Sequence, residues 1–185
     1  MQFEMLRAHQ RFLPLIGRRQ RRQFDEEPPV ADIDIVLSRE AEFVIRNALS
    51  TSSQHSGPLF GRQTGRTLTL AYAATHGYRA SDDPLSLDPQ YLLGLSDAYH
   101  QVTGGLDWVG HWVVAEGGGL PSPRAALHWY ELALQRHLVT TQYPLVLAGW
   151  RDSHLSLFAC TVGENEDCQW VPARFVSTPE EPHVQ

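Results

Sequence analysis

The chain has no lysine, only two cysteines and no long apolar run. All 15 basic residues are arginine, which we interpret as a genomic composition bias that favours a bacterial source. The longest apolar run is far short of the ~20 residues that a membrane-spanning helix needs. Nothing near the N-terminus resembles a secretory signal, so we expect a cytoplasmic protein without membrane contact.

An excess of positive charge is also lacking. The formal net charge is −6, whereas binding to nucleic acid relies on a cationic surface. We therefore expect no nucleic acid as the main partner. With 185 residues and 42% hydrophobic content, the chain can bury one substantial core, and two full domains would be cramped.

The two cysteines, Cys160 and Cys168, lie in one segment with no histidine pair nearby. This arrangement makes only a weak case for zinc. Because the chain has core enough without a covalent link, two reduced thiols near a hairpin are expected more than a disulfide, and the pairing stays open.

The first 29 residues differ in composition from the rest. An apolar stretch, FEMLRAHQRFLPLIG, precedes a basic run, RRQRRQ, and then DEEPP. We predict an N-terminal arm and linker over residues 1–29, with a short amphipathic helix broken near Pro14. One interpretation is a solvated tail. The other is that large apolar side chains dock on a partner or on the domain's own surface, namely Phe3, Met5, Leu6, Phe12, Leu13 and Ile16.

A single domain is predicted over residues 30–176, followed by a disordered polar tail over residues 177–185. Its first half combines a strand, ADIDIVLS, a helix capped by Ser38, and a hairpin, LFGRQTGRTLTLAYAA. Two later helices begin at Asp88-Pro89 and Ser122-Pro123, where a capping side chain precedes proline at the first helical position. Their expected core residues are Leu92, Leu95, Tyr99 and Val102 in the first helix and Leu127, Tyr130 and Leu134 in the second, which runs through about His137.

The segment from Trp108 to Ala115 is apolar on both faces, which predicts a central strand. Three more strands are predicted at YPLVLAGW, HLSLFACTV and CQWVPARFV, with GENED joining the last two. This order of elements predicts an α+β fold, in which a mixed β-sheet is flanked by helices.

Residues 33–172 resemble the JAB/MPN (JAMM) domain in the order of their elements and in three short motifs. These are Gly57-Pro58-Leu59-Phe60-Gly61, Val109-Gly110-His111-Trp112 and Leu120-Pro121-Ser122, with an insert, LSLDPQYLLGLSDAYHQVTGG, between the first two. The family contains metallo-isopeptidases that remove ubiquitin or its relatives, and inactive MPN cousins. The resemblance implies a cytidine-deaminase-like fold.

In active members of that family, a His-x-His-Pro strand end and an aspartate three residues after a serine hold zinc, and a glutamate acts as general base. Alternate strand residues point the same way, so His-x-His supplies two imidazoles to one ion. The glutamate takes the proton of the zinc-bound water.

Every one of those positions departs from the pattern in this chain. The histidine positions fall at Val113 and Ala115, the aspartate position at Ala125 and the base position at Gln54. Shifting the strand by one residue gives Trp112 and Val114, which is no better. Only Ser122 keeps its identity, and a helix N-cap explains it. The resemblance therefore implies a pseudoenzyme with no metal and no catalytic residues.

A rebuilt zinc site from His111, Glu116 and His55 is conceivable, since His111 should share a strand face with Val113 and Ala115. A structural, hydrogen-bonded role for His111 is the more common outcome. The other histidines considered, His76, His128, His137 and His154, are interpreted as scattered surface or half-buried residues.

We expect a domain that works by binding a protein. The resemblance suggests that the partner is a ubiquitin-like protein, or an E1-like or E2-like enzyme of a bacterial ubiquitin-like conjugation system. The glycines at positions 117–119 would let the backbone turn beside the cleft that an active family member would have there. Trp112 and Trp150 could equally be core residues. Two alternative functions stay open: a divergent zinc metallo-isopeptidase with shifted ligands, and a structural component of a phage or secretion assembly. The oligomeric state is also open, and a dimer is one of the possibilities. The expected binding groove comprises His55, His111, Trp112, Val113, Ala115, Glu116, Gly117, Gly118, Gly119 and Ser122.

Overall fold

A computed structural model of the chain describes residues 13, 15–17, 33–51, 55–76, 83–140, 142–162 and 168–175. The predictions for Gln54, for most of the N-terminal arm, for the GENED turn and for the tail lie outside these residues.

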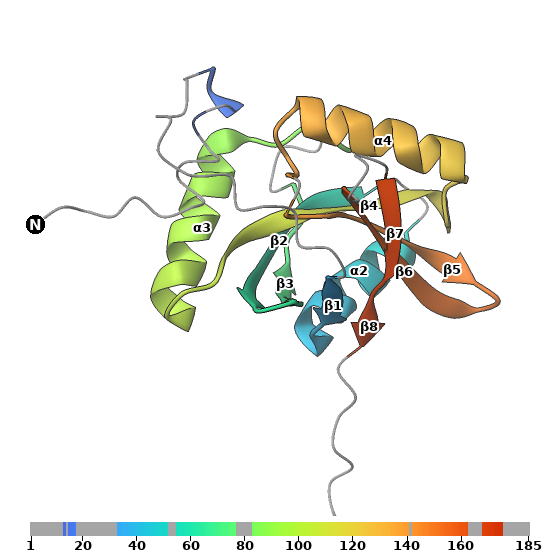
Figure 1. Ribbon diagram of the computed structural model, residues 1–185, viewed down its shortest axis with the longest axis horizontal. Helices are drawn as coiled ribbons and strands as arrows, with labels where there is room; N and C mark the ends of the chain where they lie inside the picture. Colours follow the sequence, from blue (N-terminus) through green and yellow to red (C-terminus); the bar gives the residue numbers. More distant parts are fainter. Residues whose placement is uncertain are drawn as a thin grey trace, which may run out of the picture.

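Eight described strands form one mixed sheet in the order β7-β6-β5-β4-β2-β3-β1-β8. The pairs β1/β3, β1/β8 and β4/β5 are parallel, and the other four are antiparallel. With three flanking helices, this arrangement confirms the predicted α+β class (Figure 1). The elements are β1 (Asp34–Leu37), α2 (Arg39–Leu49), β2 (His55–Thr64), β3 (Thr67–Ala73), α3 (Pro89–Thr103), β4 (Asp107–Gly119), α4 (Pro123–Gln135), β5 (Leu145–Arg151), β6 (His154–Val162), β7 (Cys168–Pro172) and β8 (Arg174–Phe175).

The sheet separates two apolar cores. On one face, α2 packs against Leu59, Trp112 and Val114, and on the other face α3 and α4 cover Val113 and Leu147. Because β4 is buried on both faces between β2 and β5, the predicted central position of this strand is confirmed.

The last described segment pairs with both ends of the sheet. β7 is antiparallel to β6, and β8 is parallel to β1. Between them Ala173 donates its N–H to the carbonyl oxygen of Leu157 at 3.1 Å and packs against the α2 core. Figure 1 shows β8 below β7 and beside β1. The single strand predicted for CQWVPARFV is therefore divided in two, because one straight strand could not reach both edges.

The helix starts follow the sequence signals. Ala41 N lies 3.1 Å from Ser38 Oγ, Gln90 N lies 2.9 Å from Asp88 Oδ1, and Ala125 N lies 3.3 Å from Ser122 Oγ. All three predicted N-caps are confirmed. Among the described residues, no helix is long and apolar enough to cross a membrane.

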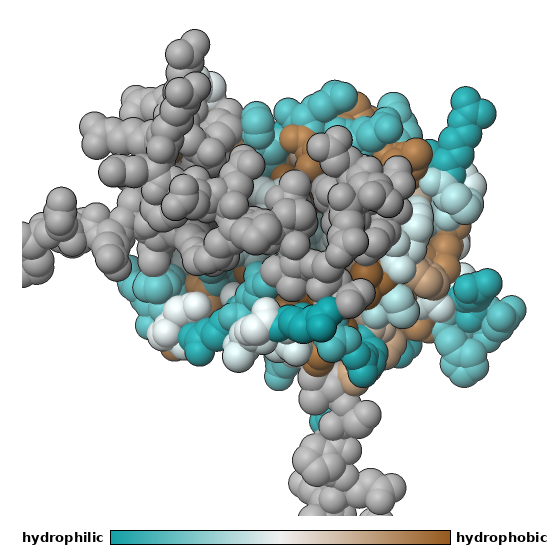
Figure 2. Space-filling view, viewed as in Figure 1, coloured by the Kyte–Doolittle hydropathy of each residue, from teal (hydrophilic) through white to brown (hydrophobic). Residues whose placement is uncertain are grey.

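The predicted burial of two helix residues is wrong. Val102 is 85% exposed and Leu127 is 43% exposed. The face of α3 that meets the sheet is centred on Leu92 and Ser96, and that of α4 on Ala126, Tyr130 and Ala133, so both residues project sideways from their helices. Figure 2 shows apolar surface among polar side chains along α4, at the top of the view.

Cys160 is fully buried in the core beneath α3 and α4. It lies opposite Trp170 in the β6/β7 register, whereas Cys168 lies opposite Val162. The two cysteines are therefore not cross-strand partners.

Candidate functional site

The pairing of β2 with β4 decides which predicted site residues share a face of the sheet. Ser56 lies opposite Val113 and Pro58 lies opposite His111, whereas His55 lies opposite Val114. Because strand residues alternate between faces, Ser56, His111 and Val113 face α3 and α4, and His55 faces α2. The shared face predicted for His111 and Val113 is confirmed.

The expected histidine and aspartate positions are occupied by apolar packing. Val113 has no exposed surface and belongs to the core beneath α3 and α4. Ala115 is half-buried just beyond it in β4, and Ala125 is half-buried in the first turn of α4. Aliphatic side chains carry no lone pair that could bind a metal ion.

Three residues expected in a binding groove need correction. His111, Trp112 and Val113 are all fully buried. Trp112 donates its indole N–H to the carbonyl oxygen of Ala74 at 2.8 Å, which satisfies its polar group inside the α2 core. These side chains therefore belong to the cores and do not line an open groove; the alternative that Trp112 is a core residue is correct.

The residues of the hypothetical zinc site are not brought together. His55 faces α2, where its Nε2 atom is hydrogen-bonded to the hydroxyl group of Thr51. His111 faces the opposite side, and its Nε2 atom donates to the carbonyl oxygen of Pro84 at 3.2 Å. Glu116 is exposed. Across the described residues, no three His, Cys, Asp or Glu side chains are arranged to hold a metal ion.

A second histidine accompanies His111 in the structure. The ring of His76 lies 5.7 Å from that of His111, centroid to centroid, and Ser56 Oγ is hydrogen-bonded to His76 Nε2. Burial lowers the pKa of His76; the Pro84 carbonyl and Asp83 act in the opposite direction, and His55 adds to the lowering. The imidazole is therefore held toward its neutral form.

This pair is not predicted from the sequence, in which His76 is one of several scattered histidines. The hairpin register contains the missing signal. Leu59 lies opposite Ala73, so extending the same antiparallel register by three residues places Ser56 opposite His76.

The glycine run of β4 forms a bulge. Val114 lies opposite Ala148, but the next pair is Gly119 with Trp150, so four residues of β4 face the single Gly149. Gly117 and Gly118 have φ angles of +79° and +70°, which favour glycine. The backbone turn predicted for the glycines is confirmed, although it lies within the strand and not in a separate loop.

The bulge places several predicted residues at the surface. Glu116, Gly117, Gly119 and Ser122 are exposed, and Gly118 is buried. His55 and Ala115 are half-buried at the same end of the β2/β4 pair. We refer to this set as the bulge surface, which consists of His55, Ala115, Glu116, Gly117, Gly119 and Ser122.

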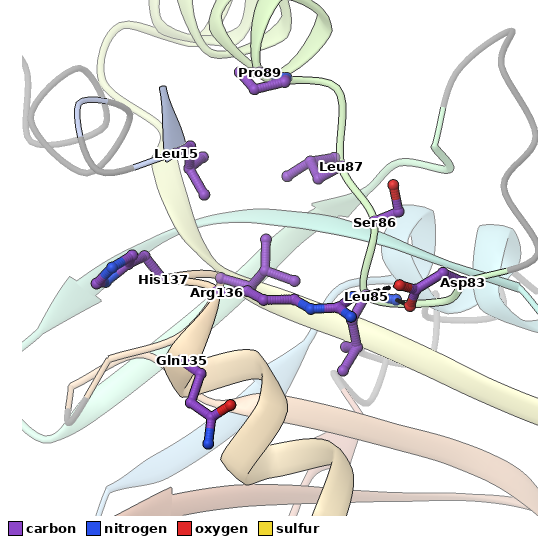
Figure 3. Close-up of a pocket in the computed structure, with 10 residues that line it drawn as sticks. Leu15, Asp83, Leu85, Ser86, Leu87, Pro89, Gln135, Arg136 and His137 are labelled. Carbon is purple, nitrogen blue, oxygen red and sulfur yellow. Dashed lines mark hydrogen bonds and ion pairs between the residues drawn. The ribbon is translucent and has the colours of Figure 1, made fainter. Parts of the chain in front are cut away.

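A cavity of about 560 Å³ lies elsewhere, between the loop that precedes α3 and the C-terminal end of α4. Figure 3 shows Arg136 of the α4 end reaching Asp83 of the loop, an ion pair of 2.5 Å. Leu15, from the N-terminal arm, lines the same cavity. This cavity has no signal in the sequence, because its walls come from three distant parts of the chain.

Comparison with known proteins identifies a shared fold. No protein-family model and no curated protein matches the chain. A solved structure, that of protein DSY2949 from Desulfitobacterium hafniense, is similar with a TM-score of 0.54 and 14% sequence identity. The match covers 81% of this chain and 97% of that chain. Similarity at this level of identity is a similarity of fold alone.

Proposed function

We propose that the chain is a JAB/MPN-like domain that has lost its metal centre and works by binding a protein. The single observation that carries the proposal is the burial of Val113. This residue stands at the first expected histidine position and has no exposed surface. A metal ion there would have to replace a tightly packed aliphatic side chain, which carries no lone pair that could bind it.

The glycines of the first motif also support the proposal. A Cβ atom on Gly57 would lie 1.9 Å from the carbonyl oxygen of Ala74, and one on Gly61 would lie 2.1 Å from that of Thr69. The motif therefore has a packing role in the sheet that does not depend on catalysis. Retention of these glycines is compatible with loss of the enzyme activity.

The bulge surface is the proposed binding surface. Its exposed backbone at Glu116, Gly117 and Gly119 lies at the end of the central strand, where an extended segment of a partner could reach main-chain groups. Following the family resemblance, we propose a ubiquitin-like protein, or an E1-like or E2-like enzyme, as the partner in a bacterial cell.

Gly119→Trp is the sharpest test of this surface. A side chain at Gly119 would enter open space, so the variant should fold while its indole covers the bulge. Gly94→Trp is the matched control, because Gly94 in α3 also faces open space and lies on a different element. In affinity capture from the native host, we expect wild type and Gly94→Trp to retain the partner, and Gly119→Trp to retain about tenfold less.

Capture of a ubiquitin-like, E1-like or E2-like protein in this pattern would support the proposal. Equal capture by all three baits would exclude the bulge surface. Recovery of phage-particle or secretion-assembly components would instead favour the structural alternative.

Metal content separates the proposal from a divergent zinc isopeptidase. Zinc is measured in protein purified without chelator, as wild type and as His111→Ala. We expect less than one equivalent of zinc per protein chain in both wild type and the variant. Stoichiometric zinc that disappears in His111→Ala, together with cleavage of a ubiquitin-like fusion, would overturn the binding function.

A further inference from the structure

The cavity between α3 and α4 has a mixed lining: half of its residues are apolar and half are polar or charged. Leu85 and Leu138 are 3% and 1% exposed and form its base, while Leu87 and Pro89 line one side. Its volume of about 560 Å³ falls in the range of ordinary ligand pockets. A mixed lining of this kind suits an amphipathic segment, which presents both apolar and polar side chains.

Three polar contacts hold the loop wall in place. His111 donates to the Pro84 carbonyl at 3.2 Å, Leu85 N lies 3.0 Å from Asp83 Oδ1, and Arg136 is paired with Asp83 at 2.5 Å. The wall is therefore tied to the central strand on one side and to α4 on the other. The cavity does not need a ligand to form.

Part of the N-terminal arm already lies at this cavity. Leu15 lines it and packs against the core beneath α3 and α4, whereas its neighbour Ile16 is 41% exposed. In Figure 3 the side chain of Leu15 points inward, across from Leu87 and Pro89. The space of about 560 Å³ remains open beside this side chain.

We propose that the cavity is the docking site for residues 3–12 of the same chain, with Leu15 as the anchor next to them. This stretch carries four large apolar side chains, whose exposure to water is unfavourable: Phe3, Met5, Leu6 and Phe12. Phe12 is three residues from Leu15, so at most about 10 Å of extended chain separates them. An occupant tethered at this distance has a high effective concentration at the cavity.

The interaction is an intramolecular one between the arm and the cavity, and it does not depend on the proposed function. Docked residues 3–12 would lie against the half-buried side chains of Leu87 and Pro89 and would leave the bulge surface free. Failure of either inference leaves the other intact.

Limited proteolysis of the full chain by trypsin tests this docking. Arg7 lies within the proposed occupant, and Arg18 lies just after the anchor and serves as an internal reference. The rate of cleavage after each is followed by mass spectrometry. We expect cleavage after Arg7 to be about tenfold slower than after Arg18, since a docked segment must open before it is cut.

Phe12→Asp should abolish this protection without affecting the core, and Leu87→Asp should do so from the cavity side. The matched controls are Phe24→Asp, beyond the basic run of the arm, and Val102→Asp, on the exposed side of α3; both should keep the protection. Equal cleavage after Arg7 and Arg18 in wild type would overturn the proposal, as would protection that survives Phe12→Asp. Protection that disappears on dilution would assign the site to the arm of a second copy and would overturn docking within one chain.

Discussion

The imidazole of His111 and the carbonyl oxygen of Pro84 are hydrogen-bonded at 3.2 Å, which joins the buried central strand to the loop before α3. His76 packs beside this contact, with its ring tilted and its centroid 5.7 Å from that of His111, and is itself hydrogen-bonded to Ser56. The two imidazoles thus connect β2 and β4 with the segment after β3 and the loop before α3. His111 therefore contributes to holding the fold together.

Removing the His111 side chain should destabilise the protein. His111→Ala leaves a space in the core and takes a donor from the Pro84 carbonyl, so we expect a loss of about 2–4 kcal/mol in the free energy of unfolding. His128→Ala, at an exposed position of α4, is the control and should change it by less than about 0.5 kcal/mol. Urea titration measures both. Equal stability of His111→Ala and wild type would contradict the anchoring role.

Much of the fold could be predicted because its signals are local. The caps at Ser38, Asp88 and Ser122 depend on a few neighbouring residues, and the hairpin depends on alternation around one turn. The predicted burial of Val102 and Leu127 is wrong because the face that a helix buries depends on the sheet against which it packs. The break at Ala173 likewise follows from pairing with two distant strands.

Stability should depend on pH through His76. Burial lowers its pKa in the folded state below the ordinary value of 6.5, so the unfolded chain binds more protons just below neutrality. The free energy of unfolding should therefore be greatest above about pH 6.5 and decrease as the pH falls through that value toward the folded-state pKa. The groups that face His76 are Ser56, His111, Asp83 and, at longer range, His55.

The variant His76→Gln isolates this contribution. Urea titrations at several pH values between about 5.5 and about 8 should show a shallower decrease in stability for His76→Gln than for wild type. Parallel pH profiles for the two proteins would show that His76 titrates alike in the folded and unfolded chains, contrary to the prediction.

The candidate site was less predictable than the fold for a physical reason. The positions of Val113 and Ala115 follow from counting along one strand, so their face could be predicted. The bulge opposite Gly149 and the proximity of His76 to His111 depend on cross-strand register, which one sequence determines only indirectly. The cavity at Leu87 depends on three segments and has no local signal.

Gly149 should tolerate no side chain, because the bulge passes directly over it. A Cβ atom there would lie 2.5 Å from Leu120 N and 2.6 Å from the carbonyl carbon of Gly119, both backbone atoms that cannot move aside independently. We expect Gly149→Ala to lower the free energy of unfolding by about 1–3 kcal/mol. Gly94→Ala is the matched control: it faces open space in α3 and should raise stability by about 1 kcal/mol. A stable Gly149→Ala protein would mean that the bulge does not adopt this register.

The C-terminal end of α4 offers a stabilising substitution at His137. Leu138 N donates to the carbonyl oxygen of Ala133 at 2.9 Å and His137 N to that of Leu134 at 3.0 Å, which together form a Schellman motif. The motif requires a left-handed residue, and His137 has a φ angle of +59°.

Glycine adopts this conformation without the steric cost that a Cβ atom imposes, so His137→Gly should raise the free energy of unfolding by about 1 kcal/mol. His137→Ala removes the imidazole but keeps the Cβ atom, so thermal or urea unfolding should show no comparable gain for it. If the alanine variant is stabilised as much as the glycine variant, the gain comes from the lost imidazole and not from relief of backbone strain.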